Sequence, residues 1–185
     1  MKMMFYQELL SEMEYTPNEK IIYSFLIYKS ITLIDCAFTS DGTELDYNEI
    51  VNTLEWDNVV TMYSISQRKL ANALGIANKS VFNALKTLDY YSDINLKQSL
   101  IKIQPKIIKG KFFPLLLESG LKGELLIFYS YLKHKSEYFG GTIDTFKYKL
   151  AEEFHTTKIA VTNMLNRLYR KGFAERLENG KLKIN

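Results

Sequence analysis

Two stretches of the chain, KLANALGIANKSVFNALKTL at residues 69–88 and KLAEEFHTTKIAVTNMLNRL at residues 149–168, align without a gap at an offset of 80. Seven of the 20 aligned positions are identical, and most of the others keep their polarity class. Self-similarity at a fixed spacing indicates that one structural unit occurs more than once in a chain. The 185 residues are therefore expected to hold two copies of one helical module.

A shorter match lies upstream of each stretch. Residues 21–30 share six of ten positions with residues 127–136, at an offset of 106. Because the two offsets differ by 26, the first copy is expected to carry about 26 additional residues, which lie within residues 31–62.

The first copy has the pattern of three helices. A capping box with proline at the first helical position predicts a helix that begins at residue 17. A helix over about 66–74 is expected to end at Gly75, since glycine adopts the left-handed conformation that a helix end needs. A third helix, about 78–89, has apolar side chains at i, i+3, i+4 and i+7, which are expected to face inward: Val81, Ala84, Leu85 and Leu88. The last two helices form a helix-turn-helix.

The second copy repeats this helix-turn-helix. His155 takes the place of Gly75, and histidine enters positive φ more readily than most side chains do. The inward side chains are expected to be Val161, Met164, Leu165 and Leu168.

A β-hairpin is expected to follow each helix-turn-helix. In the second copy, residues 173–177 and 181–184 flank an Asn-Gly turn at 179–180, which is a strong hairpin signal. In the first copy, residues 93–94 and 100–104 are interpreted as a less regular hairpin.

A helix, a helix-turn-helix and a hairpin make a winged helix. The fold class is therefore predicted to be α+β, mainly helical, with two tandem winged-helix domains (helix-turn-helix plus β-hairpin wing). The first domain is expected at residues 1–110, with an acidic insertion at about 31–62, and the second at residues 111–185.

Composition bounds the class of protein. With 46% apolar and 24% charged residues, the chain is expected to fold rather than to be disordered. The lone Cys36 excludes an intrachain disulfide and is interpreted as a buried thiol, so a cytoplasmic location is expected. The first residues lack the pattern of a signal peptide, and no stretch is apolar enough for a membrane span, so no membrane partner is expected.

Charge is distributed unevenly along the chain. Residues 1–60 hold 3 basic and 11 acidic side chains, residues 61–104 hold 6 and 2, and residues 105–185 hold 15 and 8. The net charge thus runs from −8 through +4 to +7, which favours a polyanionic partner for the later segments.

The repeat, with its helix-turn-helix and Asn-Gly wing, resembles bacterial and plasmid replication initiators and replisome organisers, whose chains often hold one or two such modules. The Phe-x-x-x-Leu-Leu segment at residues 5–10, echoed at residues 112–117, favours that group over ordinary repressors. The resemblance implies a sequence-specific double-stranded DNA-binding protein that initiates or organises replication of a plasmid or mobile element.

Two other functions stay open. One is a transcriptional regulator of the winged-helix type. The other, from a different class, is a tandem winged-helix protein-interaction scaffold that does not contact bases. Either a monomer or a homodimer is compatible with two modules in one chain.

The second helix of a helix-turn-helix enters the major groove and presents its outward face to base edges, while the wing contacts phosphate. The DNA-binding residues are therefore expected to be Asn78, Lys79, Asn83 and Lys86 in the first module, and Thr157, Lys158, Thr162, Asn163, Asn166, Arg167 and Arg170 in the second. Lys171, Arg176, Lys181 and Lys183 are expected to contact phosphate around the second wing. The alternative is that these are ordinary solvated side chains.

Two apolar residues interrupt these polar faces. Phe82 and Ile159 each contact either a thymine methyl group or another part of the protein, and packing is favoured for Phe82.

The insertion within residues 31–62 holds seven carboxylates and no lysine or arginine. It is interpreted either as a solvated elaboration with a short helix at about 46–54, or as a contact surface for a protein partner or for the second module.

Catalytic and metal sites are not expected. His134 and His155 have no carboxylate or second histidine at metal-ligand spacing, and the acidic residues lack a calcium or magnesium pattern. The sequence therefore predicts no enzyme and no cofactor.

Overall fold

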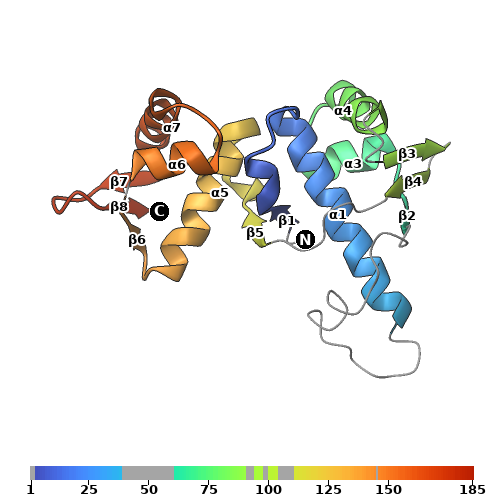
Figure 1. The fold of residues 1–185 in the computed structure, drawn as a ribbon, viewed down its shortest axis with the longest axis horizontal. Helices are drawn as coiled ribbons and strands as arrows, with labels where there is room; N and C mark the ends of the chain where they lie inside the picture. The colour runs from blue at the N-terminus through green and yellow to red at the C-terminus, as the bar shows by residue number, and fades with distance from the viewer. Residues whose placement is uncertain (1–2, 39–60, 91–93, 98–99, 104–110, 145) are drawn as a thin grey trace. The chain divides into compact units, whose positions relative to one another are not determined.

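The computed structural model of the chain describes residues 3–38, 61–90, 94–97, 100–103, 111–144 and 146–185. The fold is α+β and mostly helical, with small antiparallel sheets (Figure 1). Contacts divide the chain into two compact units. We call Met1–Pro17 with Phe112–Asn185 the C-terminal unit, and Asn18–Lys111 the middle unit.

The C-terminal unit begins with a two-stranded antiparallel sheet made from distant segments. Strand β1 (Met3–Tyr6) pairs with β5 (Phe112–Leu115), and Phe5 lies opposite Phe113. Both rings are fully buried, with centroids 5.1 Å apart. Short 3-10 turns follow the two strands, at Gln7–Leu10 and Leu117–Ser119. Burial of the aromatic side chains thus holds the start of the chain to residues that follow the middle unit.

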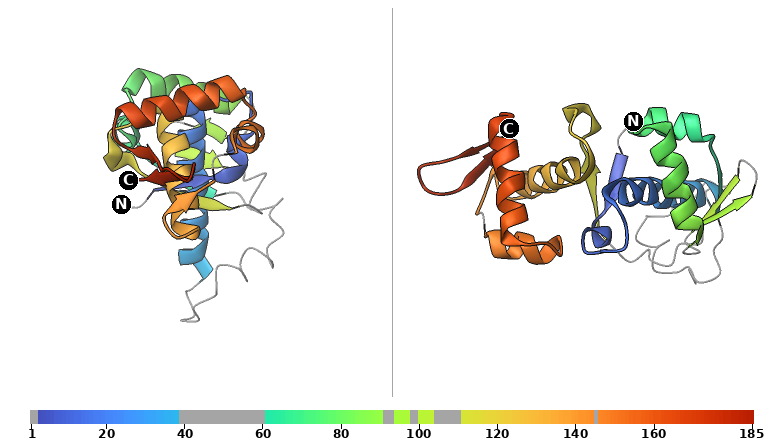
Figure 2. Two further views of the ribbon diagram at one scale, coloured as in Figure 1. Left: turned by 90° about the vertical axis from the view of Figure 1, so that its left-hand side faces the viewer. Right: turned by 90° about the horizontal axis from the view of Figure 1, so that it is seen from above.

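The rest of this unit has the order helix, strand, helix, helix, hairpin. Its elements are α5 (Gly123–Tyr138), β6 (Thr142–Ile143), α6 (Lys147–Glu153), α7 (Lys158–Arg170), β7 (Ala174–Arg176) and β8 (Leu182–Ile184). The strands form one antiparallel sheet in the order β6-β8-β7. In Figures 1 and 2 the β7–β8 hairpin extends away from the helices of its unit.

Helix α5 is the centre of the packing in the C-terminal unit. Its side chains from Leu125 to Leu132 are all buried. Phe154, at the end of α6, contacts α5 through Phe128 and Tyr131, with ring centroids 5.2 and 5.5 Å apart. Since burying an aromatic ring removes a large apolar area from water, these contacts attach the helix-turn-helix to α5.

The middle unit repeats the same order of elements. They are α1 (Pro17–Phe38), β2 (Thr61–Ser64), α3 (Gln67–Leu74), α4 (Asn78–Tyr90), β3 (Ile94–Lys97) and β4 (Leu100–Ile103). The strand order is β2-β4-β3, so in both units the strand before the helix-turn-helix pairs with the second strand of the hairpin.

Where the structure describes the chain, the helices and hairpins predicted from the sequence are confirmed to within a few residues. The four inward side chains expected on each third helix are all buried, and the helix that begins at Pro17 buries Ile21, Ile22, Phe25 and Leu26. The sequence did not predict β2, β6 or the pairing of β1 with β5. Strands of two to four residues have too few alternating positions for a periodic signal, and the β1–β5 pairing is not local.

The domain limits drawn at residues 1–110 and 111–185 stay a prediction, although contacts group Met1–Pro17 with the C-terminal unit. Part of the expected insertion continues α1 as far as Phe38. The helix expected at about 46–54 and the side chain of Cys36 lie outside the described part of the chain.

The turn inside each helix-turn-helix has the same backbone hydrogen bond. In the middle unit, the N–H of Ile76 donates to the carbonyl of Ala71 (3.1 Å) across Gly75, whose φ is 62°. In the C-terminal unit, the N–H of Thr156 donates to the carbonyl of Ala151 (2.8 Å), and the residue before it is His155, with φ 43°. His155 is the one non-glycine residue with positive φ in the described part of the chain. The prediction that histidine adopts glycine's place in the turn is confirmed.

The two turns predict opposite effects on stability when a side chain is added at Gly75 and when one is removed at His155. A Cβ on Gly75 would meet nothing within 4 Å, so Gly75→Ala is expected to cost only the backbone strain, about 1 kcal/mol of unfolding free energy. His155→Gly removes that strain, and is expected to stabilise by up to about 1 kcal/mol. Urea unfolding of both variants measures this, and a loss of stability in His155→Gly would contradict the assignment of strain.

Candidate nucleic-acid interface

Helix α7 has one buried face and one exposed polar face. Thr157 caps its start, because the side-chain oxygen accepts a hydrogen bond from the N–H of Ala160 (3.1 Å). The buried face consists of the four apolar residues predicted above. The exposed face carries Lys158, Asn163 and Asn166, with Thr162 half-buried beside them. The buried face therefore determines which donors and acceptors point to solvent.

A tight turn joins the two strands of the hairpin that follows α7. The Asn179 side chain accepts a hydrogen bond from the N–H of Lys181 (3.0 Å), and Gly180 adopts φ 79°. The N–H of Leu177 also donates to the carbonyl of Lys181 (2.9 Å). An asparagine that bonds its own backbone and a glycine at positive φ are what this kind of turn requires.

A groove of about 330 Å³ lies between α7 and this hairpin. Three predicted site residues line it: Thr162 and Asn166 from α7, and Arg176 from β7. Lys147, at the start of α6, and Tyr169 line it too, and neither was predicted. Together they bring two cationic side chains, an amide and two hydroxyls into one groove, next to the Asn179-Gly180 turn.

Tyr169 is a neutral phenol within this groove. Burial raises its pKa above the ordinary value, and the nearby Arg176 guanidinium opposes that shift by favouring the ionised form. The hydroxyl therefore keeps its proton at neutral pH and is available as a donor to an anionic oxygen.

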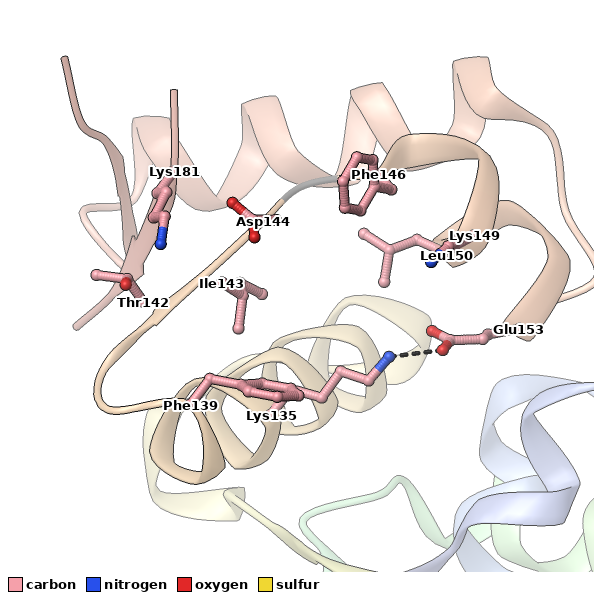
Figure 3. Close-up of a pocket in the computed structure, with 10 residues that line it drawn as sticks. All are labelled: Lys135, Phe139, Thr142, Ile143, Asp144, Phe146, Lys149, Leu150, Glu153 and Lys181. Atoms are coloured by element: carbon pink, nitrogen blue, oxygen red, sulfur yellow. Dashed lines mark hydrogen bonds and ion pairs between the residues drawn. The ribbon is translucent and has the colours of Figure 1, made fainter. Parts of the chain in front are cut away.

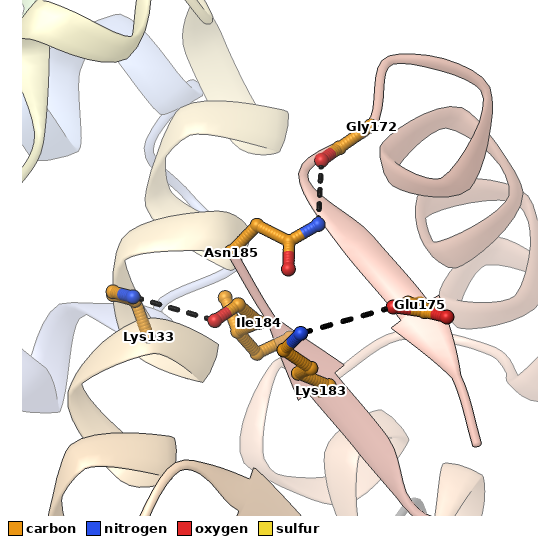
Figure 4. A network of polar contacts seen from close by, with 6 residues as sticks. All are labelled: Lys133, Gly172, Glu175, Lys183, Ile184 and Asn185. Atoms are coloured by element: carbon orange, nitrogen blue, oxygen red, sulfur yellow. Dashed lines mark hydrogen bonds and ion pairs between the residues drawn. The ribbon is translucent and has the colours of Figure 1, made fainter.

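The remaining predicted residues of the C-terminal unit are exposed, and none of them lines the groove. Lys183 lies opposite Glu175 across the hairpin, with the two charged groups 4.0 Å apart (Figure 4). Arg170 donates from Nε to the carbonyl of Asn166 (3.4 Å). Lys158, Arg167, Lys171 and Lys181 make no ion pair within the part of the chain that the structure describes.

Contacts at the end of the chain hold the hairpin in place. The Asn185 side chain donates to the carbonyl of Gly172 (2.8 Å), and Lys133 donates to the carbonyl of Ile184 (3.3 Å), as Figure 4 shows. Tyr129 donates to the carbonyl of Asn185 (2.7 Å). Since Lys133 and Tyr129 belong to α5, the hairpin is fixed to the central helix of its unit.

In the middle unit, the four predicted residues on α4, Asn78, Lys79, Asn83 and Lys86, are all exposed. Packing was favoured for Phe82, yet its side chain is 41% exposed. The Lys86 ammonium lies 4.6 Å from the centre of the Phe82 ring. Phe82 thus adds an aromatic ring with a cation above it to the exposed face of α4.

No group of three or more His, Cys, Asp or Glu side chains is placed to hold a metal ion in the ranges that the structure describes. Across those same ranges, every helix is too short or too polar to cross a bilayer. Comparisons of the chain with family models, with curated proteins and with solved structures give no match.

The buried tyrosines predict an alkaline loss of stability. Burial raises the pKa of Tyr129 and Tyr131 above the ordinary 10.0, and nearby carboxylates raise both further. The unfolded chain therefore loses these protons first, so the tyrosines' contribution to the free energy of unfolding is expected to be fully present below about pH 10 and to fall as the pH rises beyond it. Urea unfolding between about pH 8 and about pH 11 tests this. Tyr129→Phe should make the fall shallower, and a stability that rises above pH 10 would contradict the pKa assignment.

Proposed function

We propose that the chain is a sequence-specific double-stranded DNA-binding protein made of two tandem winged-helix modules. The support is the element order and strand order that the two units share, because a helix, a strand, a helix-turn-helix and a hairpin in that order are the parts of a winged helix.

The observation that carries the proposal is the groove between α7 and the hairpin. Its cationic and hydroxyl groups suit phosphate oxygens, while the exposed Lys158 and Asn163 on the same helix suit base edges. With α7 in the major groove, the hairpin would meet the adjacent sugar-phosphate backbone.

For the biological role, we propose initiation or organisation of replication of a plasmid or mobile element. The support is the resemblance of the repeat and of its Phe-x-x-x-Leu-Leu segment to initiators. A winged-helix transcriptional regulator is the second candidate. Sequencing of the fragments that the protein retains from its source genome separates the two: repeats beside an origin support replication, and promoters support regulation.

A protein-interaction scaffold would not need a cationic groove. Binding to duplex DNA is therefore expected to depend steeply on salt, weakening at least about a hundredfold between 50 and 200 mM, because phosphate contacts release counterions. Fluorescence anisotropy with a labelled duplex measures this. An affinity that does not change with salt would remove the DNA-binding proposal.

Base contacts and phosphate contacts are expected to respond differently to mutation. Asn163→Ala should cost roughly 1–3 kcal/mol on a selected site and relax preference at one or two base pairs. Arg176→Ala, in the hairpin, should weaken binding to selected and random duplexes alike. If Arg176→Ala changes the base preference and Asn163→Ala does not, the docking of α7 is assigned wrongly.

Ile159 predicts a requirement for thymine methyl groups. Its side chain is 73% exposed at the first turn of α7. An apolar side chain gains no favourable contact from water, so a thymine methyl group would give it an apolar partner. Replacing thymine by uracil across the selected site removes only methyl groups, and is expected to weaken binding by the wild-type chain several-fold. Ile159→Ala should bind both duplexes equally. An equal loss in the variant would place the methyl contact elsewhere.

A further inference from the structure

A cavity of about 400 Å³ lies on the C-terminal unit apart from the exposed face of α7 (Figure 3). Its lining residues come from α5 and the residue after it, from β6 and the residue after it, from α6 and the residue before it, and from the hairpin at Lys181. Only Lys181 among them was predicted as a site residue, and it was assigned to phosphate.

Two aromatic rings at this cavity are exposed although they are apolar. Phe139 is 64% exposed and Phe146 is 50% exposed. Each is next to a further exposed ring. The ring centroids of Tyr138 and Phe139 lie 5.4 Å apart, and those of Tyr148 and Phe146 lie 5.9 Å apart. Ile143 and Leu150 form a buried apolar floor. The cavity therefore offers flat apolar surfaces that no described part of the chain covers.

The charges around the cavity favour an anionic ligand. Lys135 is paired with Glu153, so that carboxylate is neutralised. Lys149 lies with its ammonium 5.2 Å from the centre of the Phe146 ring, and Figure 3 shows Lys181 on the hairpin side. Neither makes an ion pair in the described residues, and Asp144 is the one other carboxylate in the lining. The lining thus has a net positive charge.

A flat apolar surface beside ammonium groups matches a nucleotide with an accessible base face. In a duplex both faces of a base are covered by its neighbours, so only an unpaired base can stack on a protein ring. We propose that this cavity, lined by Phe139, Phe146, Lys149 and Lys181, binds single-stranded DNA, with a base stacked against the rings and phosphate held by the lysines. Phe139 and Lys149 do not line the groove beside α7, so substitutions there test this inference separately from the proposed duplex interface.

Binding of the full chain to a fluorescein-labelled oligothymidylate of about 12 nucleotides tests the proposal. Phe139→Leu and Phe146→Leu keep apolar volume but lose the ring, and each should weaken binding about five- to a hundredfold. Phe139→Trp should keep the wild-type affinity. Tyr90→Leu, which removes an exposed ring from the middle unit, is the matched control and should have no effect. Far-ultraviolet circular dichroism shows that each variant is folded.

A 12-mer of abasic sites separates bases from phosphates, and the wild-type chain should bind it far more weakly than oligothymidylate. Equal affinity for the two, or no loss in the leucine variants, would overturn the proposal. So would failure of the wild-type chain to bind oligothymidylate, which is the outcome expected if the cavity instead receives an apolar side chain of a protein.

Binding of a duplex by the same variants keeps the two proposals distinct. The Phe139 variants should bind duplex within about threefold of wild type, because Phe139 does not line the groove beside α7, whereas Lys158→Ala should weaken duplex binding and leave oligothymidylate binding unchanged. If Lys158→Ala weakens both equally, single strands bind at α7 and the separate site is refuted. A wild-type chain that binds oligothymidylate but does not bind duplex DNA would refute only the proposed function.

Discussion

One backbone hydrogen bond in each unit fixes the direction in which the third helix leaves the turn. In the C-terminal unit it joins Thr156 to Ala151, and it forms only because His155 adopts positive φ. That direction places Val161 and Leu165 in the core. Because the helix is amphipathic, burying these residues leaves the opposite, polar face exposed. The groove beside α7 therefore depends on a turn that contributes no side chain to it.

The hairpin depends on a second constraint, which is the attachment of its base to α5. Tyr129 packs on Phe173 with ring centroids 4.8 Å apart and also bonds the carbonyl of Asn185. Leu182 and Ile184 are buried on the inner side of the sheet. The aromatic and hydrogen-bonding contacts act on both ends of the hairpin base, so Arg176 is held opposite Asn166 by a rigid frame rather than by a flexible loop.

Sequence reasoning succeeded where the signal is local or repeated. Helical periodicity, the glycine turn and the Asn-Gly hairpin each depend on residues within one short segment. The repeat also allowed the same elements to be recognised in two copies. It failed for β1 and β5, since their pairing depends on the middle unit lying between them in the chain. Lys147 and Tyr169 escaped prediction because a groove collects residues from separate elements, which periodicity in one helix cannot show. Phe82 was expected to pack against another part of the protein because it interrupts a polar face, yet its side chain is 41% exposed and has the Lys86 ammonium 4.6 Å from the ring centre.

The two proposed surfaces of the C-terminal unit share a boundary. Asp144 and Phe146 line both the groove beside α7 and the aromatic cavity, so the two surfaces meet at these residues. If duplex DNA occupies the groove and an unpaired strand occupies the cavity, one unit would hold DNA on both sides of a junction between paired and unpaired bases. A transcriptional regulator has no need of the second surface, whereas a protein that acts where a duplex opens does. The aromatic cavity thus bears on the choice between the two proposed roles more directly than the groove, which both roles require.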